Sequence, residues 1–145
     1  MSEDALSVLL VEDDPGDVML VRDAFAERGV VDSLAVVSDG VQALEFVRGE
    51  GDYAGARRPD LVLLDLNLPR KNGWEVLAEI KGDAGLATVP VVVLTTSQAE
   101  EDILRSYELR ANAYVSKPVE LDRFVAAVHT IDDFFIDLAK LPPPP

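Results

Sequence analysis

Five short, mainly apolar runs recur along the chain, and turn-forming residues bound each of them. Runs of four or five residues are too short for free-standing helices, and most lack the polar alternation of a strand with one face in water. Such runs are typical of strands buried on both faces of a parallel sheet. They are Ser7–Val11, Leu34–Val37, Leu61–Leu64, Val91–Leu94 and Ala113–Ser116.

The segments between these runs carry apolar residues three and four positions apart, which is the spacing of a helix with one buried face. The order of strands and helices therefore predicts an α/β fold, a parallel sheet with helices on both faces and right-handed crossovers. Asp39-Gly40 indicates a turn, and Gly49–Asp60 indicates an exposed loop. The predicted helices are Pro15–Arg28, Val41–Val47, Trp74–Ile80, Glu100–Tyr107 and Glu120–Lys140.

Composition narrows the class of protein. A length of 145 residues, 48% of them hydrophobic, predicts a single domain spanning residues 1–145. The net charge of −14 disfavours non-specific binding to nucleic acid or to an anionic membrane surface. The absence of cysteine excludes disulfides, thiolate zinc sites and a cysteine nucleophile. No run approaches the roughly 18 apolar residues of a membrane span, and the amino terminus lacks a basic signal segment, so we expect a cytoplasmic protein.

Polar residues follow the predicted strands at one edge of the sheet. Glu12 and Asp13 end the first strand, Asp65 the third, Thr95 the fourth and Lys117 the fifth. Ligand sites of open parallel sheets lie beyond the carboxyl ends of the strands. Carboxylates that converge there repel one another, so either a proton is taken up or a hard divalent cation lies among them. Mg²⁺ is the natural occupant of such a site.

The same edge can support phosphate chemistry. A cation that bridges a carboxylate and a phosphoryl oxygen, with a lysine opposite and a hydroxyl nearby, forms the electrostatic clamp that phosphoryl transfer requires. Asp65 could then act as a nucleophile and form an aspartyl phosphate. Taken alone, however, an aspartate after a strand is often only a turn former or a helix cap. Both interpretations of Asp65, as a nucleophile and as a turn former, stay open at this point.

Four motifs in order resemble the receiver domains of two-component response regulators. They are VEDD (Val11–Asp14), PDLVLLDLNLP (Pro59–Pro69) with Gly73, VVVLTTS (Val91–Ser97) and AYVSKP (Ala113–Pro118). Each is weak alone, but together they cover nearly the whole chain. The resemblance implies a flavodoxin-like, doubly wound fold whose five strands are ordered 2-1-3-4-5.

The resemblance also implies site residues. Asp65 would accept a phosphoryl group from the phosphohistidine of a sensor histidine kinase. Asp13, Asp65 and the main-chain carbonyl of Asn67 would bind Mg²⁺, and Glu12 would act through a water molecule. The protein would be a phosphoacceptor switch that takes part in its own phosphorylation and hydrolysis, rather than a metabolic enzyme.

Three further residues would carry the response, according to the same resemblance. Lys117 would pair with the phosphate, Thr95 would shift to bond it, and Tyr114 would follow Thr95 inward. Thr96 and Ser97 leave open which hydroxyl senses the phosphate, and Tyr114 could instead be an ordinary strand aromatic. The resulting conformational change would alter binding to another protein.

The carboxyl-terminal region extends beyond the predicted core of about residues 6–130. The long last helix and the extension 131–145, with its proline tail, predict either a surface for a homodimer or partner, or a packed tail. The ending IDDFFIDLAKLP and the long loop before Pro59 are similar to those of single-domain regulators that partner phytochrome-type kinases.

A rival function belongs to a different class. Mg²⁺-dependent phosphatases or phosphotransferases that act on small phosphorylated substrates also use an aspartate nucleophile at a strand end. They usually need a second aspartate two residues on, and Asn67 occupies that position.

Arg70 and Lys71 place two cations in the loop that follows Asp65, which is a departure from the commonest receiver pattern.

Overall fold

The computed structural model describes residues 6–28, 31–56, 58–95 and 100–116. Within them, five parallel strands form one sheet in the order β2-β1-β3-β4-β5, which confirms the predicted parallel α/β fold and its strand order. The strands are β1 (Leu6–Val11), β2 (Val31–Val37), β3 (Leu61–Leu64), β4 (Val91–Thr95) and β5 (Ala113–Ser116).

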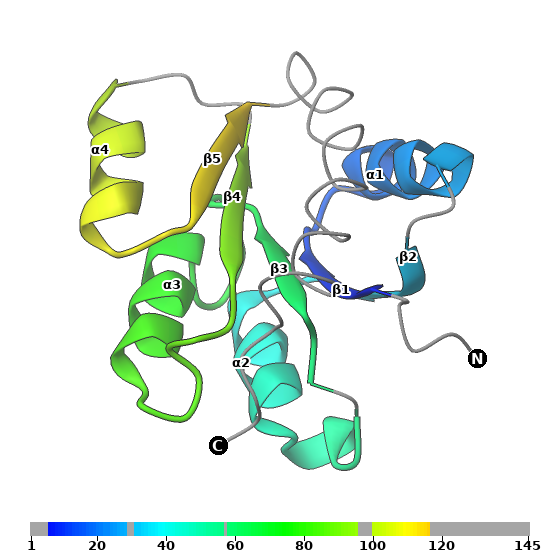
Figure 1. Cartoon of the computed structure of the whole chain (residues 1–145), viewed down its shortest axis with the longest axis horizontal. Helices are drawn as coiled ribbons and strands as arrows, with labels where there is room; N and C mark the ends of the chain where they lie inside the picture. The colour runs from blue at the N-terminus through cyan, green and yellow to red at the C-terminus, as the bar shows by residue number, and fades with distance from the viewer. Residues whose placement is uncertain (1–5, 29–30, 57, 96–99, 117–145) are drawn as a thin grey trace, which may run out of the picture.

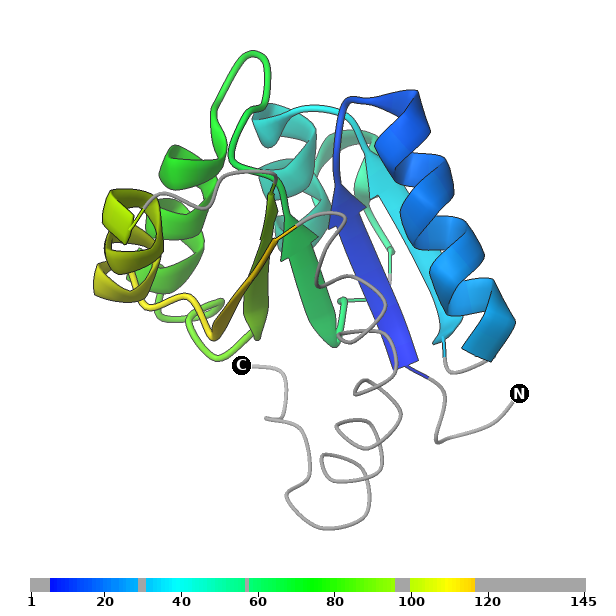
Figure 2. The same cartoon turned by 90° about the horizontal axis from the view of Figure 1, so that it is seen from above.

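Helices cover both faces of this sheet. Figures 1 and 2 show α1 on one face and α2 and α3 on the other, which is the arrangement that right-handed crossovers produce in a doubly wound fold. The helices are α1 (Pro15–Arg28), α2 (Gly40–Arg48), α3 (Gly73–Gly82) and α4 (Glu100–Glu108), with a short 3₁₀ helix η1 (Gly51–Tyr53).

The central strands are buried because their side chains alternate between two hydrophobic clusters. Leu9 and Val11 pack into the cluster that includes residues of α2 and α3, whereas Val8 and Leu10 pack into the cluster that includes Val21 of α1. A strand with helices on both faces has no side that faces water. This explains why the strands appear in the sequence as continuous apolar runs.

Some predicted boundaries were wrong. Strand β2 begins at Val31, three residues earlier than its apolar run suggested, because Leu6 and Ser7 of β1 pair with Val31 and Ser33. Asp39-Gly40 is a helix start rather than a separate turn, since Asp39 caps α2 and Gly40 is the first residue of that helix. The predicted last helix, the extension 131–145 and Lys117 lie outside the described residues.

The predicted loop Gly49–Asp60 contains more structure than its glycines suggested. It includes η1, and the ring of Tyr53 lies 5.2 Å from that of Phe46 in α2. Asp60, at its end, accepts a hydrogen bond from the backbone N–H of Ser7 at 2.9 Å. The loop therefore packs against α2 and is fixed to the start of the sheet.

Helices α3 and α4 flank a pocket of about 330 Å³. The guanidinium of Arg105 lies 4.4 Å from the centre of the Trp74 ring, a cation–π contact between the two helices. The pocket is lined by Asn72, Trp74, Glu75, Ala78, Arg105, Glu108 and Leu109.

Among the helices in the described part of the chain, none is both long and apolar enough to span a membrane.

A buried lysine joins several segments at the amino-terminal edge of the sheet. The ammonium group of Lys81 donates to the carbonyls of Ala87 and Val89, at 3.1 and 2.7 Å, and to Oδ1 of Asn112 at 3.1 Å. The same Asn112 oxygen accepts from the N–H of Val91. Lys81 thus ties the end of α3 to the starts of β4 and β5.

Burial lowers the pKa of Lys81 below its ordinary 10.5, and the nearby charge of Arg110 lowers it further. The folded protein therefore releases this proton at a lower pH than the unfolded chain does. Just below pH 10.5 the unfolded state binds more protons at this position, so the Lys81 contribution to the free energy of unfolding rises with pH.

We expect this linkage to disappear in Lys81→Met, which keeps an apolar stem but has no proton to release. In urea unfolding at a series of pH values approaching 10.5, the free energy of unfolding of the wild type should rise relative to that of Lys81→Met. A difference between the two proteins that stays constant across the series would contradict this assignment.

Candidate functional site

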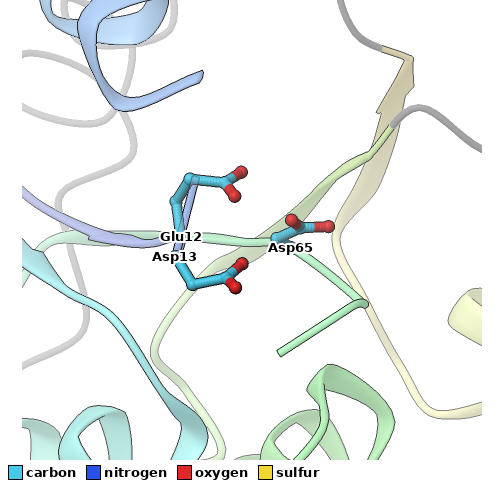
Figure 3. A group of neighbouring side chains, drawn as sticks. All are labelled: Glu12, Asp13 and Asp65. Carbon is cyan, nitrogen blue, oxygen red and sulfur yellow. The ribbon is translucent and has the colours of Figure 1, made fainter. Parts of the chain in front are cut away.

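Strand pairing brings three carboxylates together at the carboxyl edge of the sheet. Glu12 and Asp13 directly follow β1, and Asp65 directly follows the neighbouring strand β3. The N–H of Asp65 donates to the carbonyl of Val11 at 3.1 Å, which fixes the two strand ends side by side. One carboxylate oxygen from each of the three residues lies within 4.8 Å of the others. In Figure 3 the carboxylates of Glu12 and Asp13 lie on the side toward Asp65.

The three carboxylates differ in exposure and in their local hydrogen bonds. Glu12 and Asp65 are buried, whereas Asp13 is exposed. Glu12 accepts from the N–H of Asp14 at 3.1 Å, and Asp65 accepts from the N–H of Asn67 at 3.3 Å. Each of these main-chain donors offsets a part of the negative charge. The cluster is therefore open to water on the Asp13 side and backed by protein on the other.

Three carboxylates at this separation fit a hard divalent cation. Oxygen ligands from a few carboxylates, completed by water, are what Mg²⁺ prefers, and a cation among them removes their mutual repulsion. Asp13 and Asp65 are the side chains that would hold it directly, and Glu12 would hold it through a water molecule. The predicted convergence of these three residues is therefore seen in the structure, and the donor set fits the predicted cofactor.

A glycine allows α3 to begin directly against the Asp65 backbone. A Cβ atom at Gly73 would lie 2.3 Å from the carbonyl oxygen of Asp65 and 2.6 Å from the Cα of Leu66. The N–H of Gly73 donates to the carbonyl of Leu66 at 3.0 Å, and Asn72 caps the helix by accepting from the N–H of Glu75. The start of α3 thus sets the path of the chain after Asp65.

The other predicted site residues are placed only in part. Thr95 ends β4 and is paired with Ser116 of β5, but its side chain and all of Lys117 lie outside the described residues. Tyr114 is half-buried in β5 and packs against the core. Asn67 is exposed in the segment that follows Asp65. The roles predicted for these four residues stay predictions.

Sequence reasoning missed one residue at this edge. Asp39 is buried, caps α2 and accepts a hydrogen bond from Arg70 Nη1 at 3.0 Å. The spacing of Asp39 and Gln42 matches a capping box and could have shown that Asp39 starts a helix. Nothing in the sequence shows that it also pairs with Arg70.

A family model described as the response regulator receiver domain matches residues 8–129. The response regulator Rcp1 of Synechocystis sp. is 43% identical over 135 residues, which cover 93% of this chain and 92% of that protein.

Two solved structures extend the likeness to the fold. The phosphorylated cyanobacterial phytochrome response regulator RcpA is 46% identical, with a TM-score of 0.81 over 96% of this chain and 99% of that one. The Mn²⁺-bound form of Rcp1 is 42% identical, with a TM-score of 0.79 over 95% of this chain and 99% of that one.

We expect Asp13→Asn to weaken Mg²⁺ binding by about tenfold, equivalent to about 1.4 kcal/mol, because the variant removes the exposed negative side chain of the cluster. Titration calorimetry with Mg²⁺ measures this directly. Asp52→Asn is the matched control, since it removes the same charge from the exposed helix η1. Equal weakening in both variants would mean that only the overall charge matters.

The close approach at Gly73 predicts a steric effect. Gly73→Ala should lower the free energy of unfolding by about 1–3 kcal/mol, because the new methyl group overlaps backbone atoms of Asp65 and Leu66. Gly82→Ala, at the other end of α3, is the control, since its Cβ would meet nothing within 4 Å. Urea unfolding should separate the two variants, and equal stabilities would contradict the steric reading.

Proposed function

The chain belongs to the response regulator receiver domain family, and we propose that it is a switch that accepts a phosphoryl group on Asp65 in a Mg²⁺-dependent reaction. The observation that supports this most directly is the cluster of Glu12, Asp13 and Asp65, whose carboxylate oxygens lie within 4.8 Å of one another. The family assignment gives the class of the protein. The chemistry of this cluster gives the proposed acceptor and cofactor.

Asp65 is the proposed nucleophile because of its position in the cluster. It lies at the end of the buried strand β3, and its carboxylate is mostly shielded from water. One of its oxygens accepts from the N–H of Asn67. An oxygen of Asp65 would form the new bond to phosphorus as the bond to the donor breaks, giving an acyl phosphate. Bound Mg²⁺ would supply charge neutralisation for the phosphoryl oxygens.

The remaining roles follow the family pattern. Asp13, Asp65 and the carbonyl of Asn67 would hold Mg²⁺, with Glu12 acting through water. Lys117 would pair with the phosphoryl group, and Thr95 and Tyr114 would carry the change to the protein surface. The place of Tyr114 in β5, half-buried beside the core, is compatible with a ring that moves inward.

The proposed phosphoryl donor is a sensor histidine kinase of the phytochrome type. Support comes from RcpA, which is named as a phytochrome response regulator and resembles this chain along almost its full length. The response would be an altered affinity for another protein, or for a second copy of this chain through its carboxyl-terminal region. We place this exchange in the cytoplasm.

Incubation with acetyl phosphate and Mg²⁺ tests the proposed acceptor. Intact mass spectrometry should show the gain of one phosphoryl group on the wild type and on the control Asp52→Asn, but none on Asp65→Asn. Omission of Mg²⁺ should abolish the gain, because the negative cluster then repels the phosphoryl donor.

The rival class of function has a different outcome in the same mixture. A phosphatase or phosphotransferase that acts on small substrates would turn over varied phosphoesters steadily and would not accumulate the modified protein. Such turnover, lost in Asp65→Asn, would replace the proposed switch.

A further inference from the structure

The segment between β3 and α3 is held at both ends. At its start, the N–H of Asp65 bonds to Val11, and at its end the N–H of Gly73 bonds to Leu66. Between these points lies Asn67, whose main-chain carbonyl is the proposed third protein ligand of the metal. The middle of the segment must therefore keep one conformation for that carbonyl to stay in place.

Arg70, in the middle of this segment, has a backbone that needs support. Its φ angle is 65°, in the left-handed region that side chains other than glycine rarely adopt. The Arg70 guanidinium donates to Oδ2 of Asp39 at 3.0 Å. This contact crosses from the β3–α3 segment to the start of α2 and can hold the unfavourable conformation.

Asp39 is a rigid partner for Arg70. Its side chain is 8% exposed, and its other oxygen accepts from the N–H of Gln42 at 2.8 Å as the cap of α2. Surface ion pairs are usually weak because two mobile side chains must be ordered together. Here the carboxylate is already fixed by the helix, so only the arginine has to be ordered.

The backbone of the segment also lies directly against α2. A Cβ atom at Gly40 would lie 1.9 Å from the carbonyl oxygen of Lys71, so only glycine permits this approach. The Lys71 ammonium pairs with Glu79, which also lies 3.5 Å from the Arg48 guanidinium. The hydrogen bond from Lys71, and the charges of Lys71 and Arg48, hold the pKa of Glu79 below its ordinary 4.5 despite partial desolvation. Both cations of the segment are therefore paired with carboxylates outside the acidic cluster.

We propose that Arg70 and Asp39 form a positioning pair that holds the β3–α3 segment in the conformation needed for metal binding. The proposal rests on the proposed function, since the Asn67 carbonyl matters only if it is a metal ligand. Arg70 is not a proposed ligand of the metal or of the phosphoryl group, and its guanidinium contacts Asp39. It acts through the backbone that leads from Asn67 to α3.

Loss of the pair should lower the affinity for Mg²⁺ more than it lowers the rate of phosphorylation at saturating Mg²⁺. Without Arg70, the segment samples other conformations, and part of the binding free energy is spent on ordering it again. Once the metal is bound, the segment regains its ordered form. We therefore expect phosphorylation to need a higher Mg²⁺ concentration, while its maximal rate stays nearly unchanged.

The direction in which Arg70→Gln changes the affinity for Mg²⁺ tests this proposal. Loss of a positive charge near an acidic cluster should by itself strengthen cation binding, whereas loss of a positioning contact should weaken it. We expect titration calorimetry to show Mg²⁺ binding weakened by about tenfold, the lower end of the effect of outer contacts on metal sites. Unchanged or tighter binding would overturn the proposal.

A double-mutant cycle isolates the pair. Asp39→Asn keeps an oxygen to cap α2 but removes the charge that holds Arg70, and it should weaken Mg²⁺ binding to a similar extent. The double variant should bind no more weakly than either single variant, because both remove the same contact. Additive losses would overturn the proposal. Arg58→Gln is the matched control, since the Arg58 guanidinium bonds to Thr88 Oγ1, away from this segment.

Phosphorylation by acetyl phosphate separates this proposal from the proposed function. At saturating Mg²⁺, Arg70→Gln should be phosphorylated at a rate within about twofold of the wild type, and a loss of maximal rate without a loss of Mg²⁺ affinity would overturn the positioning role. If the wild type binds Mg²⁺ but takes up no phosphate, the proposed function fails, while calorimetry still decides the role of the pair.

Discussion

The repulsion between carboxylates at the end of β1 and the end of β3 is the constraint on which the functional edge of this protein depends. Glu12, Asp13 and Asp65 cannot move apart, because their backbones are fixed by pairing between adjacent buried strands. The main-chain N–H groups of Asp14 and Asn67 each offset a part of this charge. The fold thus holds three carboxylates together in a half-open cluster that a cation would fit, and pairing between β1 and β3 maintains this arrangement.

The two edges of the sheet carry buried charges of opposite sign. At the amino-terminal edge, Lys81 of α3 donates to three oxygen acceptors, two in the loop before β4 and one just before β5, so its charge is used to join these segments. At the carboxyl edge, three carboxylates lie together, and a cation among them would remove their mutual repulsion. This contrast makes the carboxyl edge the one suited to binding a cation.

The sequence was sufficient for the sheet and for the acidic cluster, because both depend on patterns that are local or that follow from topology. A buried run such as Leu61–Leu64 favours a central strand, and parallel strands bring their carboxyl ends to one edge of the sheet. The order of the strands was predicted by the resemblance to receiver domains. The pairing of Arg70 with Asp39 depends on a left-handed residue and on side chains 31 positions apart, for which one sequence carries no signal. The pair Asp39-Gly40 predicts a turn as readily as a helix start, because caps and turns favour the same residues. The pairing of Leu6 with Val31, which lengthens β2, likewise has no signal in the sequence.

The contact between Arg105 and Trp74 has a practical consequence. Trp74 is the only tryptophan of the chain, and it directly follows the glycine that packs against Asp65. Its indole is therefore attached to the start of α3 and covered by a cation from α4. The emission of this fluorophore is an optical reporter, built into the native polypeptide, of any shift between these two helices.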